Sequence, residues 1–170
     1  MTDPRWTADE ALERLYAAHW RQLVRLSVLL VRDLGTAEEV VQDAFIAVHK
    51  RWDKLRDHDR ALAYLRQAVV NQSRSTLRHR MVVARHVARG PDPDPAAGAE
   101  PGEVLDRRSA VLEAMRALPQ RQREVLALRY YLDLSEAEIA DALGISRGAV
   151  KSHASRGAAA LRELLRGDER

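Results

Sequence analysis

Residues 90–103 read GPDPDPAAGAEPGE and contain four Pro, three Gly and no large apolar residue. A segment of this composition cannot bury enough apolar surface to form a packed element. We therefore expect a flexible linker, which we place at residues 83–104, with about 80 residues before it and about 65 after it. This linker limits the chain to two small domains, each with a core of its own.

Both halves show helical periodicity. In the first half, apolar residues recur every three or four positions over about 12–30, 37–52 and 61–80, which predicts three amphipathic helices. The third helix has room to continue towards Arg89, and Thr36 with Glu39 is a candidate capping box for the second. Similar stripes lie over 111–118, 125–132 and 139–161. We expect an all-α fold with two small helical domains at residues 8–82 and 105–166, loosely coupled through the linker.

Composition excludes several classes of protein. The chain has no Cys, which rules out disulfides and thiolate metal sites, and its six His are scattered. We therefore expect no metal and no other cofactor. No apolar run approaches the roughly 20 residues that a membrane span requires, so we expect a cytoplasmic protein without membrane insertion. Catalysis is not expected either, because the sequence lacks a Ser-His-Asp order and a Gly-rich phosphate loop.

Charge is unevenly distributed along the third predicted helix. Residues 61–91 contain six Arg and no Asp or Glu, although the whole chain has 25 acidic residues. Small polar residues at positions 71–76 lie among these arginines. A basic helix of this kind favours contact with nucleic acid over an ordinary solvated face.

The stretch SEAEIADALGISRGAVKSHASRGAAAL, residues 135–161, predicts two short helices joined by a tight turn. Ser135 and Glu138 form a capping box, Gly144 suits a left-handed C-cap, and Ser146 suits the next N-cap. This order is typical of a helix-turn-helix unit, whose second helix enters the major groove of DNA. The side chains expected on its DNA-facing surface can donate to bases or phosphates: Arg147, Lys151, Ser152, Ser155 and Arg156.

Four stretches together resemble the minimal, two-domain sigma factors of bacterial RNA polymerase, the extracytoplasmic-function (ECF) group of the sigma-70 family, in its actinobacterial sigma-E-like branch. They are LYAAHWRQLVRLSVLLVRD, AEEVVQDAFIAVHKRWDKL, ALAYLRQAVVNQSRSTLRHR and ALPQRQREVLALRYYLDLSEAEIADALGISRGAVKSHASRGAAALREL. The resemblance implies a sigma-2-like domain at 8–82, which binds core polymerase and reads and melts the −10 element. It implies a sigma-4-like domain at 105–166, which binds the −35 element.

The resemblance also implies roles for individual residues. Glu39, Gln42 and Asp43 would contact the clamp helices of the largest polymerase subunit, while Val41 and Phe45 hold the core of the domain. Four residues of the third helix would contact the −10 element: Tyr64, Asn71, Arg74 and Arg78. In the helix-turn-helix unit, Lys151, Ser152 and Ser155 would read bases, and Arg147 and Arg156 would hold phosphates.

The partners that follow are core RNA polymerase, including the flap of its second-largest subunit, and promoter DNA. An anti-sigma factor is a further partner of many members of the group, for which no residue here gives evidence. The alternative is an ordinary helix-turn-helix regulator that binds duplex DNA without polymerase. A regulator with a receiver domain would alternate strands and helices in its first half, and we find no strand pattern there.

Overall fold

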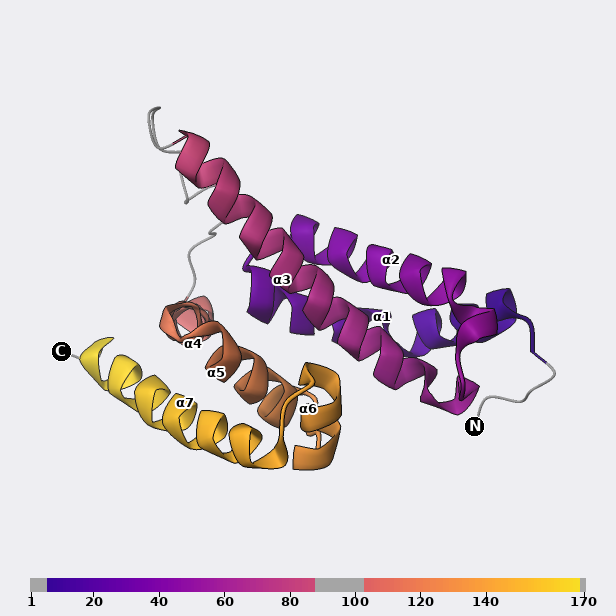
Figure 1. Ribbon diagram of the computed structural model, residues 1–170. Coiled ribbons are helices and arrows are strands. Elements are labelled where there is room, and N and C mark those ends of the chain that lie inside the picture. Colours follow the sequence, from indigo (N-terminus) through magenta and orange to yellow (C-terminus); the bar gives the residue numbers. More distant parts are fainter. Residues whose placement is uncertain (1–5, 88–102, 169–170) are drawn as a thin grey trace.

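The computed structural model describes residues 6–87 and 103–168, and these residues form helices and turns without a strand. The first half contains α1 (Ala8–Val31), α2 (Leu34–Lys50), two single 3₁₀ turns (Trp52–Lys54 and His58–Arg60) and α3 (Ala61–Val87). The second half contains α4 (Glu103–Ala117), α5 (Gln120–Leu126), a π-helical segment (Ala127–Tyr131), α6 (Glu136–Leu143) and α7 (Arg147–Asp168). Figure 1 shows the first three helices packed together and α4 to α7 grouped beside them. The all-α prediction is confirmed.

Two described helices reach into the range expected for the linker. The α3 helix continues to Val87 and α4 begins at Glu103, so the described helices enter the range 83–104 from either side. The remaining part of the Pro-rich and Gly-rich segment, residues 88–102, lies outside the described residues.

The turn between α1 and α2 differs from the sequence-based expectation. Arg32 adopts a left-handed conformation with φ of 76° and ends α1, and Asp33 is the N-cap of α2. The Asp33 carboxylate accepts hydrogen bonds from the Thr36 amide, at 3.0 Å, and from the Thr36 hydroxyl. The prediction that Thr36 itself is the N-cap was wrong, because the Asp33 carboxylate, three residues earlier, is the stronger acceptor.

A buried arginine holds the end of α4. Arg123 is only 7% exposed. Its Nε donates to the carbonyl of Met115 at 3.0 Å, and its Nη2 donates to the carbonyls of Arg116 at 3.1 Å and Leu118 at 3.0 Å. These acceptors include carbonyls that the end of a helix leaves without partners. Arg123 therefore replaces the missing backbone donors after α4.

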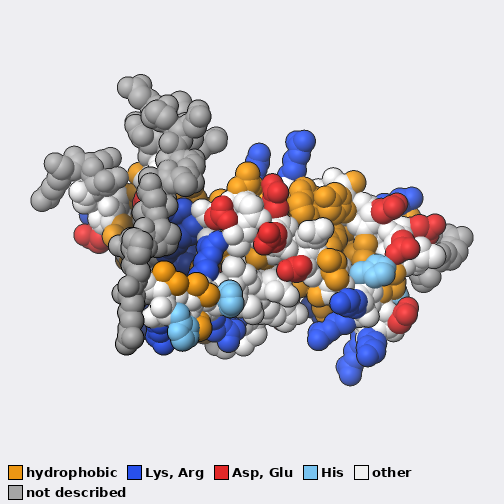
Figure 2. Space-filling model, turned by 90° about the horizontal axis from the view of Figure 1, so that it is seen from above, with side chains coloured by type: hydrophobic (Ala, Val, Ile, Leu, Met, Phe, Trp, Pro, Cys, Tyr) orange, Lys and Arg blue, Asp and Glu red, His pale blue; other side chains and the backbone are white. Residues whose placement is uncertain are grey.

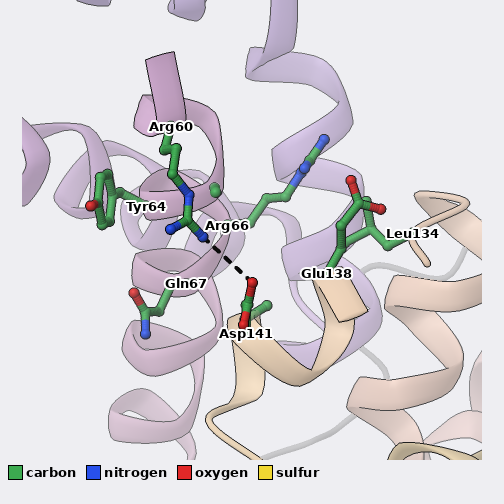
Figure 3. Close-up of a pocket in the computed structure, with 9 residues that line it drawn as sticks. Arg60, Tyr64, Arg66, Gln67, Leu134, Glu138 and Asp141 are labelled. Carbon is green, nitrogen blue, oxygen red and sulfur yellow. Dashed lines mark hydrogen bonds and ion pairs between the residues drawn. The ribbon is translucent and has the colours of Figure 1, made fainter. Parts of the chain in front are cut away.

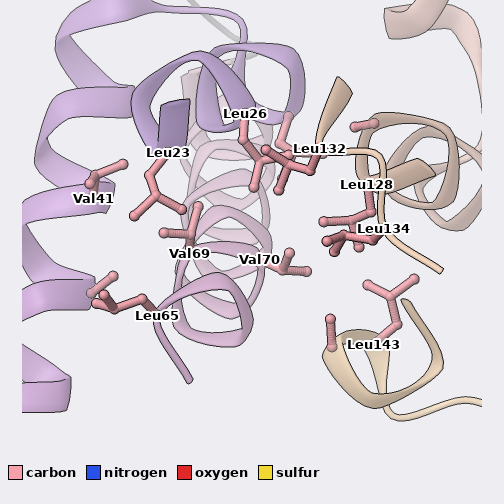
Figure 4. Close-up of a cluster of buried hydrophobic side chains, with 14 of the residues drawn as sticks. Leu23, Leu26, Val41, Leu65, Val69, Val70, Leu128, Leu132, Leu134 and Leu143 are labelled. Atoms are coloured by element: carbon pink, nitrogen blue, oxygen red, sulfur yellow. The ribbon is translucent and has the colours of Figure 1, made fainter. Parts of the chain in front are cut away.

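The two halves share one apolar core. In the first half it contains Leu23, Leu26, Leu65, Val69 and Val70, and in the second half it contains Leu128, Leu132, Leu134, Leu143 and Val150. Figure 4 shows the side chains from α1 and α3 meeting those from the segment 128–134 and from α6. The structure thus differs from the expected loose coupling: the helices of the two halves pack directly against each other.

Polar contacts reinforce this junction. The side chain of Arg32 donates to the carbonyl of Arg116 at 3.0 Å, and Arg116 donates to the carbonyl of Arg32 at the same distance. Burial lowers the pKa of Arg32, and the neighbouring charge of Arg116 lowers it further. These two reciprocal hydrogen bonds therefore hold two like charges close together and connect the end of α1 with the end of α4.

Candidate nucleic-acid interface

The helix-turn-helix unit forms as the sequence predicts. The Ser135 hydroxyl accepts from the Glu138 amide at 3.2 Å, and the Glu138 carboxylate accepts from the Ser135 amide at 2.8 Å, which completes the capping box. Gly144 has φ of 65° and ends α6 in the left-handed conformation that favours glycine. The Ser146 hydroxyl accepts from the Ala149 amide at 3.1 Å and starts α7. The angle between α6 and α7 is thereby fixed by local chemistry.

The inner side of α7 is held by small and buried residues. Val150 and Ala154 are buried. A Cβ atom added to Gly157 would lie 3.1 Å from Leu126 Cδ1 and 3.2 Å from Gln122 Cβ. A larger residue at position 157 would therefore have to displace Leu126 or Gln122 by a few tenths of an ångström, and the close approach of α7 to α5 sets which side of α7 faces outward.

The outer side of α7 brings together the residues that the sequence predicts for DNA contact. All five side chains are exposed: Arg147, Lys151, Ser152, Ser155 and Arg156. The Lys151 Nζ lies 3.9 Å from a carboxylate oxygen of Glu136, and such an exposed pair contributes little to stability. Phosphate or base acceptors can therefore replace Glu136 at low free-energy cost.

A second group of predicted residues lies around a cleft of about 380 Å³ between the end of α2 and α3. Tyr64 and Asn71, two turns apart on α3, both line it. Three more polar side chains line the cleft that the sequence did not single out: Lys50, Arg51 and Gln67. The cleft has the size of a small-ligand pocket and combines an aromatic ring with amides and positive charge. These groups suit an unstacked base and its phosphate.

The loop before α3 closes one end of this cleft through Leu55. The His58 ring stacks on Trp52 with centroids 4.4 Å apart, and its Nε2 lies 2.9 Å from the Trp52 carbonyl oxygen. A carbonyl can only accept, so the neutral ring carries its proton on Nε2. The loop is therefore held in a defined conformation beside the cleft.

Arg74 and Arg78 differ in exposure and in partners, although the family resemblance implies that both follow a DNA strand. Arg78 is exposed. Arg74 is 19% exposed, and its Nε donates to both carboxylate oxygens of Glu124, at 2.7 and 3.2 Å. The buried Glu124 carboxylate requires a cation, and Arg74 donates to it directly, whereas Arg121 lies 3.7 Å from it. In this structure Arg74 therefore contacts α5, and its role in strand contact stays a prediction.

The predicted polymerase-binding residues lie on the outward side of α2. Glu39, Gln42 and Asp43 are exposed, whereas Val41 and Phe45 are buried as predicted. Ile46 lies three residues after Asp43 and is 46% exposed, a feature that the sequence analysis missed. The sequence feature that could have identified Ile46 was its position outside the buried apolar stripe of α2. Figure 2 looks onto the side where α2 lies and shows acidic side chains beside hydrophobic ones.

Residues 6–87 and 103–168 contain no group of three or more His, Cys, Asp or Glu that could hold a metal ion. Within the same ranges, no helix has the length and apolar character that a membrane span needs.

Two family models match the chain. The model described as "Sigma-70 region 2" matches residues 15–81, and the model described as "Sigma-70, region 4" matches residues 108–161. The first match contains α2 and nearly all of the acid-free α3, and the second contains the helix-turn-helix unit. The two surfaces described above therefore lie within the two matched regions.

Curated relatives match most of this chain. RNA polymerase sigma-E factor of Streptomyces avermitilis is 34% identical over 143 residues, which are 84% of this chain and 78% of the relative. ECF RNA polymerase sigma factor SigM of Mycobacterium tuberculosis is 30% identical, over 91% of this chain and 77% of the relative. The probable RNA polymerase sigma factor RfaY of Xanthomonas campestris is 32% identical over 92% of this chain, but the chain spans only 41% of that relative.

A solved structure shares the fold. The sigma factor RpoE from Bartonella quintana, in complex with the anti-sigma factor NepR, matches with a TM-score of 0.70, and the match covers 91% of this chain and 96% of that one. Its sequence identity is 22%, so this likeness concerns the fold alone. Together with the family models and the curated relatives, the helical fold shows that this chain belongs to the sigma-70 family of RNA polymerase sigma factors, in the ECF group, whose members direct RNA polymerase to promoters.

Proposed function

We propose that this sigma factor recognises its promoters through two separate surfaces, with residues 8–82 acting at the −10 element and residues 105–166 at the −35 element. The observation that carries this proposal is the set of five exposed donor side chains on α7, opposite a closely packed inner side. An ordinary surface helix does not need both features, whereas a recognition helix in a major groove does.

At the −35 element, α7 lies in the major groove. Lys151, Ser152 and Ser155 contact base edges, and Arg147 and Arg156 contact phosphates. Lys and Ser side chains pair with base acceptors, whereas phosphate contacts fix the position of the protein without reading sequence. The sequence preference at −35 therefore depends on the first three residues.

At the −10 element, the cleft beside α3 receives an unstacked base. Tyr64 stacks on that base, Asn71 contacts its edge, and Arg74 and Arg78 follow the strand backbone. Lys50 and Arg51 add positive charge at the opposite wall. Base capture compensates for an unpairing cost of a few kcal/mol, so strand opening needs no chemistry by this protein, and we infer a non-enzymatic role.

Core RNA polymerase is the partner that holds both surfaces in place. Glu39, Gln42 and Asp43 of α2 bind the clamp helices of the largest subunit, and the second domain binds the flap of the second-largest subunit. Neither DNA surface then needs high affinity alone, because attachment to one polymerase raises the effective concentration of the other surface. These partners place the protein in the cytoplasm. The anti-sigma complex of the Bartonella relative makes an anti-sigma factor a further candidate partner.

Run-off transcription from a promoter library, with purified core polymerase and with or without this protein, tests the proposal. We expect promoter-specific transcripts that depend on the protein, and the enriched sequences will define both elements. Binding to duplex DNA alone, without transcription in the presence of core polymerase, would instead indicate an ordinary helix-turn-helix regulator.

Two matched variants test the orientation of α7. Lys151→Ala should change the preferred −35 sequence, whereas Arg156→Ala should weaken all promoters about equally and reduce the salt dependence of binding by about one phosphate contact. The opposite pattern would mean that α7 is rotated about its axis relative to the proposed orientation.

A further inference from the structure

A small cavity lies where α3 packs against α5, at the junction of the two halves. Its volume is about 10 Å³. Apolar side chains of Leu30, Val70 and Leu77 line part of it, and polar side chains line the rest. A cavity needs roughly 10–15 Å³, measured with a sphere of the size of water, to hold one water molecule. The space therefore suits one water molecule and no larger ligand.

Two polar atoms from the walls of this cavity are buried without a hydrogen-bond partner among the described residues. One is the Oγ of Ser73, a residue that is 1% exposed. The other is the Nη2 of Arg74. Both residues line the cavity. Buried polar groups are nearly always hydrogen-bonded, to protein or to an ordered water molecule, because an unpaired buried donor or acceptor destabilises the folded state.

The Arg74–Glu124 pair places a third polar group beside these two atoms. Arg74 donates to both carboxylate oxygens through Nε alone, at 2.7 and 3.2 Å, although a guanidinium can pair with a carboxylate through two parallel N–H groups. Its Nη2 is therefore available to another acceptor. Glu124 also lines the cavity, and each of its carboxylate oxygens can accept more than one hydrogen bond. One small molecule in the cavity is thus placed to bridge Ser73, Arg74 and Glu124.

The charges around the cavity restrict its ligand to a neutral molecule. Glu124 repels an anion, whereas Arg74 and Arg123 repel a cation. The ligand must also accept a hydrogen bond from Arg74 Nη2 and donate one to the Glu124 carboxylate. Water fits in size, in charge and in hydrogen bonding.

Another ion pair at the same junction differs in its access to solvent. Arg60 Nη2 lies 3.5 Å from Asp141 Oδ2, and both side chains are exposed. Figure 3 shows these two side chains pointing toward each other beside a pocket of about 180 Å³. Bulk water solvates both of these charges, so this pair does not depend on a bound molecule, unlike the buried Arg74–Glu124 pair.

We propose that the cavity between α3 and α5 binds one ordered water molecule. This water accepts a hydrogen bond from Arg74 Nη2 and donates one to Ser73 Oγ and one to the Glu124 carboxylate. Three hydrogen bonds are typical of a buried water molecule. The apolar core shared by the two halves thus contains a hydrated ion pair, whichever promoter element α3 contacts.

Two serine substitutions should give different results if the water is bound. Ser73→Ala removes one acceptor of the water, so we expect Tm to fall by about 2–4 °C, the effect of losing about one hydrogen bond in a protein of this size. Ser27 on α1 is the matched control, because it is buried and its Oγ has no partner among the described residues, but it does not line the cavity. Ser27→Ala removes an unpaired hydroxyl, so its Tm should equal or exceed that of the wild-type protein. No fall in Ser73→Ala, or equal falls in the two variants, would overturn the proposal.

A high-resolution crystal structure of the full wild-type chain locates the water directly. We expect one ordered water molecule within about 3.2 Å of Ser73 Oγ, Arg74 Nη2 and a Glu124 carboxylate oxygen. A direct hydrogen bond from Arg74 Nη2 to Glu124 or to Ser73 Oγ, with no water between them, would refute the proposal whatever the two Tm values are.

Discussion

Replacement of Arg123 tests whether one buried side chain stabilises the second half of the chain. Arg123→Met keeps much of the apolar stem but removes all three hydrogen bonds to the carbonyls after α4. A hydrogen bond to a charged group contributes about 1.5–3 kcal/mol, and contributions of neighbouring bonds do not add fully. The gross loss is therefore about 5 kcal/mol.

A second term reduces this loss. Burial lowers the pKa of Arg123, and the charge of Arg32 lowers it further, so the folded state holds this cation at a cost. Removing the charge relieves that cost. We expect a net loss of about 3–4 kcal/mol in the free energy of unfolding, a large share of the roughly 5–15 kcal/mol that stabilises a domain.

Urea unfolding followed by far-UV circular dichroism measures this loss. Arg121→Met is the matched control on the same helix: Arg121 is 37% exposed, its bond to the Leu143 carbonyl is 3.4 Å long, and loss of its 3.7 Å ion pair with Glu124 leaves Glu124 the shorter pair with Arg74. We expect that control to lose less than about 1 kcal/mol. Equal losses in the two variants, or a loss below about 1 kcal/mol in Arg123→Met, would refute the assignment of Arg123 as the cap of α4.

Three further perturbations follow from the structure. Gly148→Ala should stabilise the protein by up to about 1 kcal/mol because its Cβ makes only an ordinary contact, 3.9 Å from Ser146 Oγ, whereas Gly157→Ala should destabilise it because its Cβ crowds α5; thermal unfolding compares the two. Asp33→Ala should remove about 1 kcal/mol of capping. The Thr36 hydrogen bonds lower the pKa of Asp33, so the capping contribution is fully present above the ordinary pKa of 3.8 and is lost as pH falls through the folded-state pKa. Below that pH, the wild-type protein and the variant should have the same free energy of unfolding. Ile46→Ser should weaken binding to core polymerase about tenfold without changing stability. Competition between the variant and the wild-type protein for core polymerase measures this loss.

The helices and the helix-turn-helix unit could be predicted because their determinants are local. The capping box at Ser135 and the glycine at position 144 act within a few residues, and the structure confirms both. The error at Thr36 was also local: two possible caps three residues apart, Asp33 and Thr36, compete, and the sequence alone does not show which backbone conformation Arg32 adopts.

The junction between the halves could not be predicted because it depends on pairs far apart in sequence. Glu124 has the sequence surroundings of an ordinary exposed acid on a basic helix, and only packing against α3 buries it with Arg74, fifty residues away in the chain. Arg123 likewise resembles a solvated charge until the end of α4 is placed over it. Ile46 was missed for a different reason: helical periodicity identifies only the residues of the buried stripe, and Ile46 lies outside it.

The exposed surface on α2 constrains the order of events during polymerase binding. Glu39, Gln42 and Asp43 remain exposed while the two halves are packed together, so the proposed polymerase contact with α2 does not require the halves to separate first. A partner with equal affinity for the packed and the separated states cannot shift the equilibrium between them. Separation must therefore draw on contacts that the second half makes only after it leaves α3. A polymerase that lacks its site for the second half should still bind the proposed α2 surface, but it should leave energy transfer high between dyes on cysteines introduced at the exposed positions Lys54 and Arg162, one in each half.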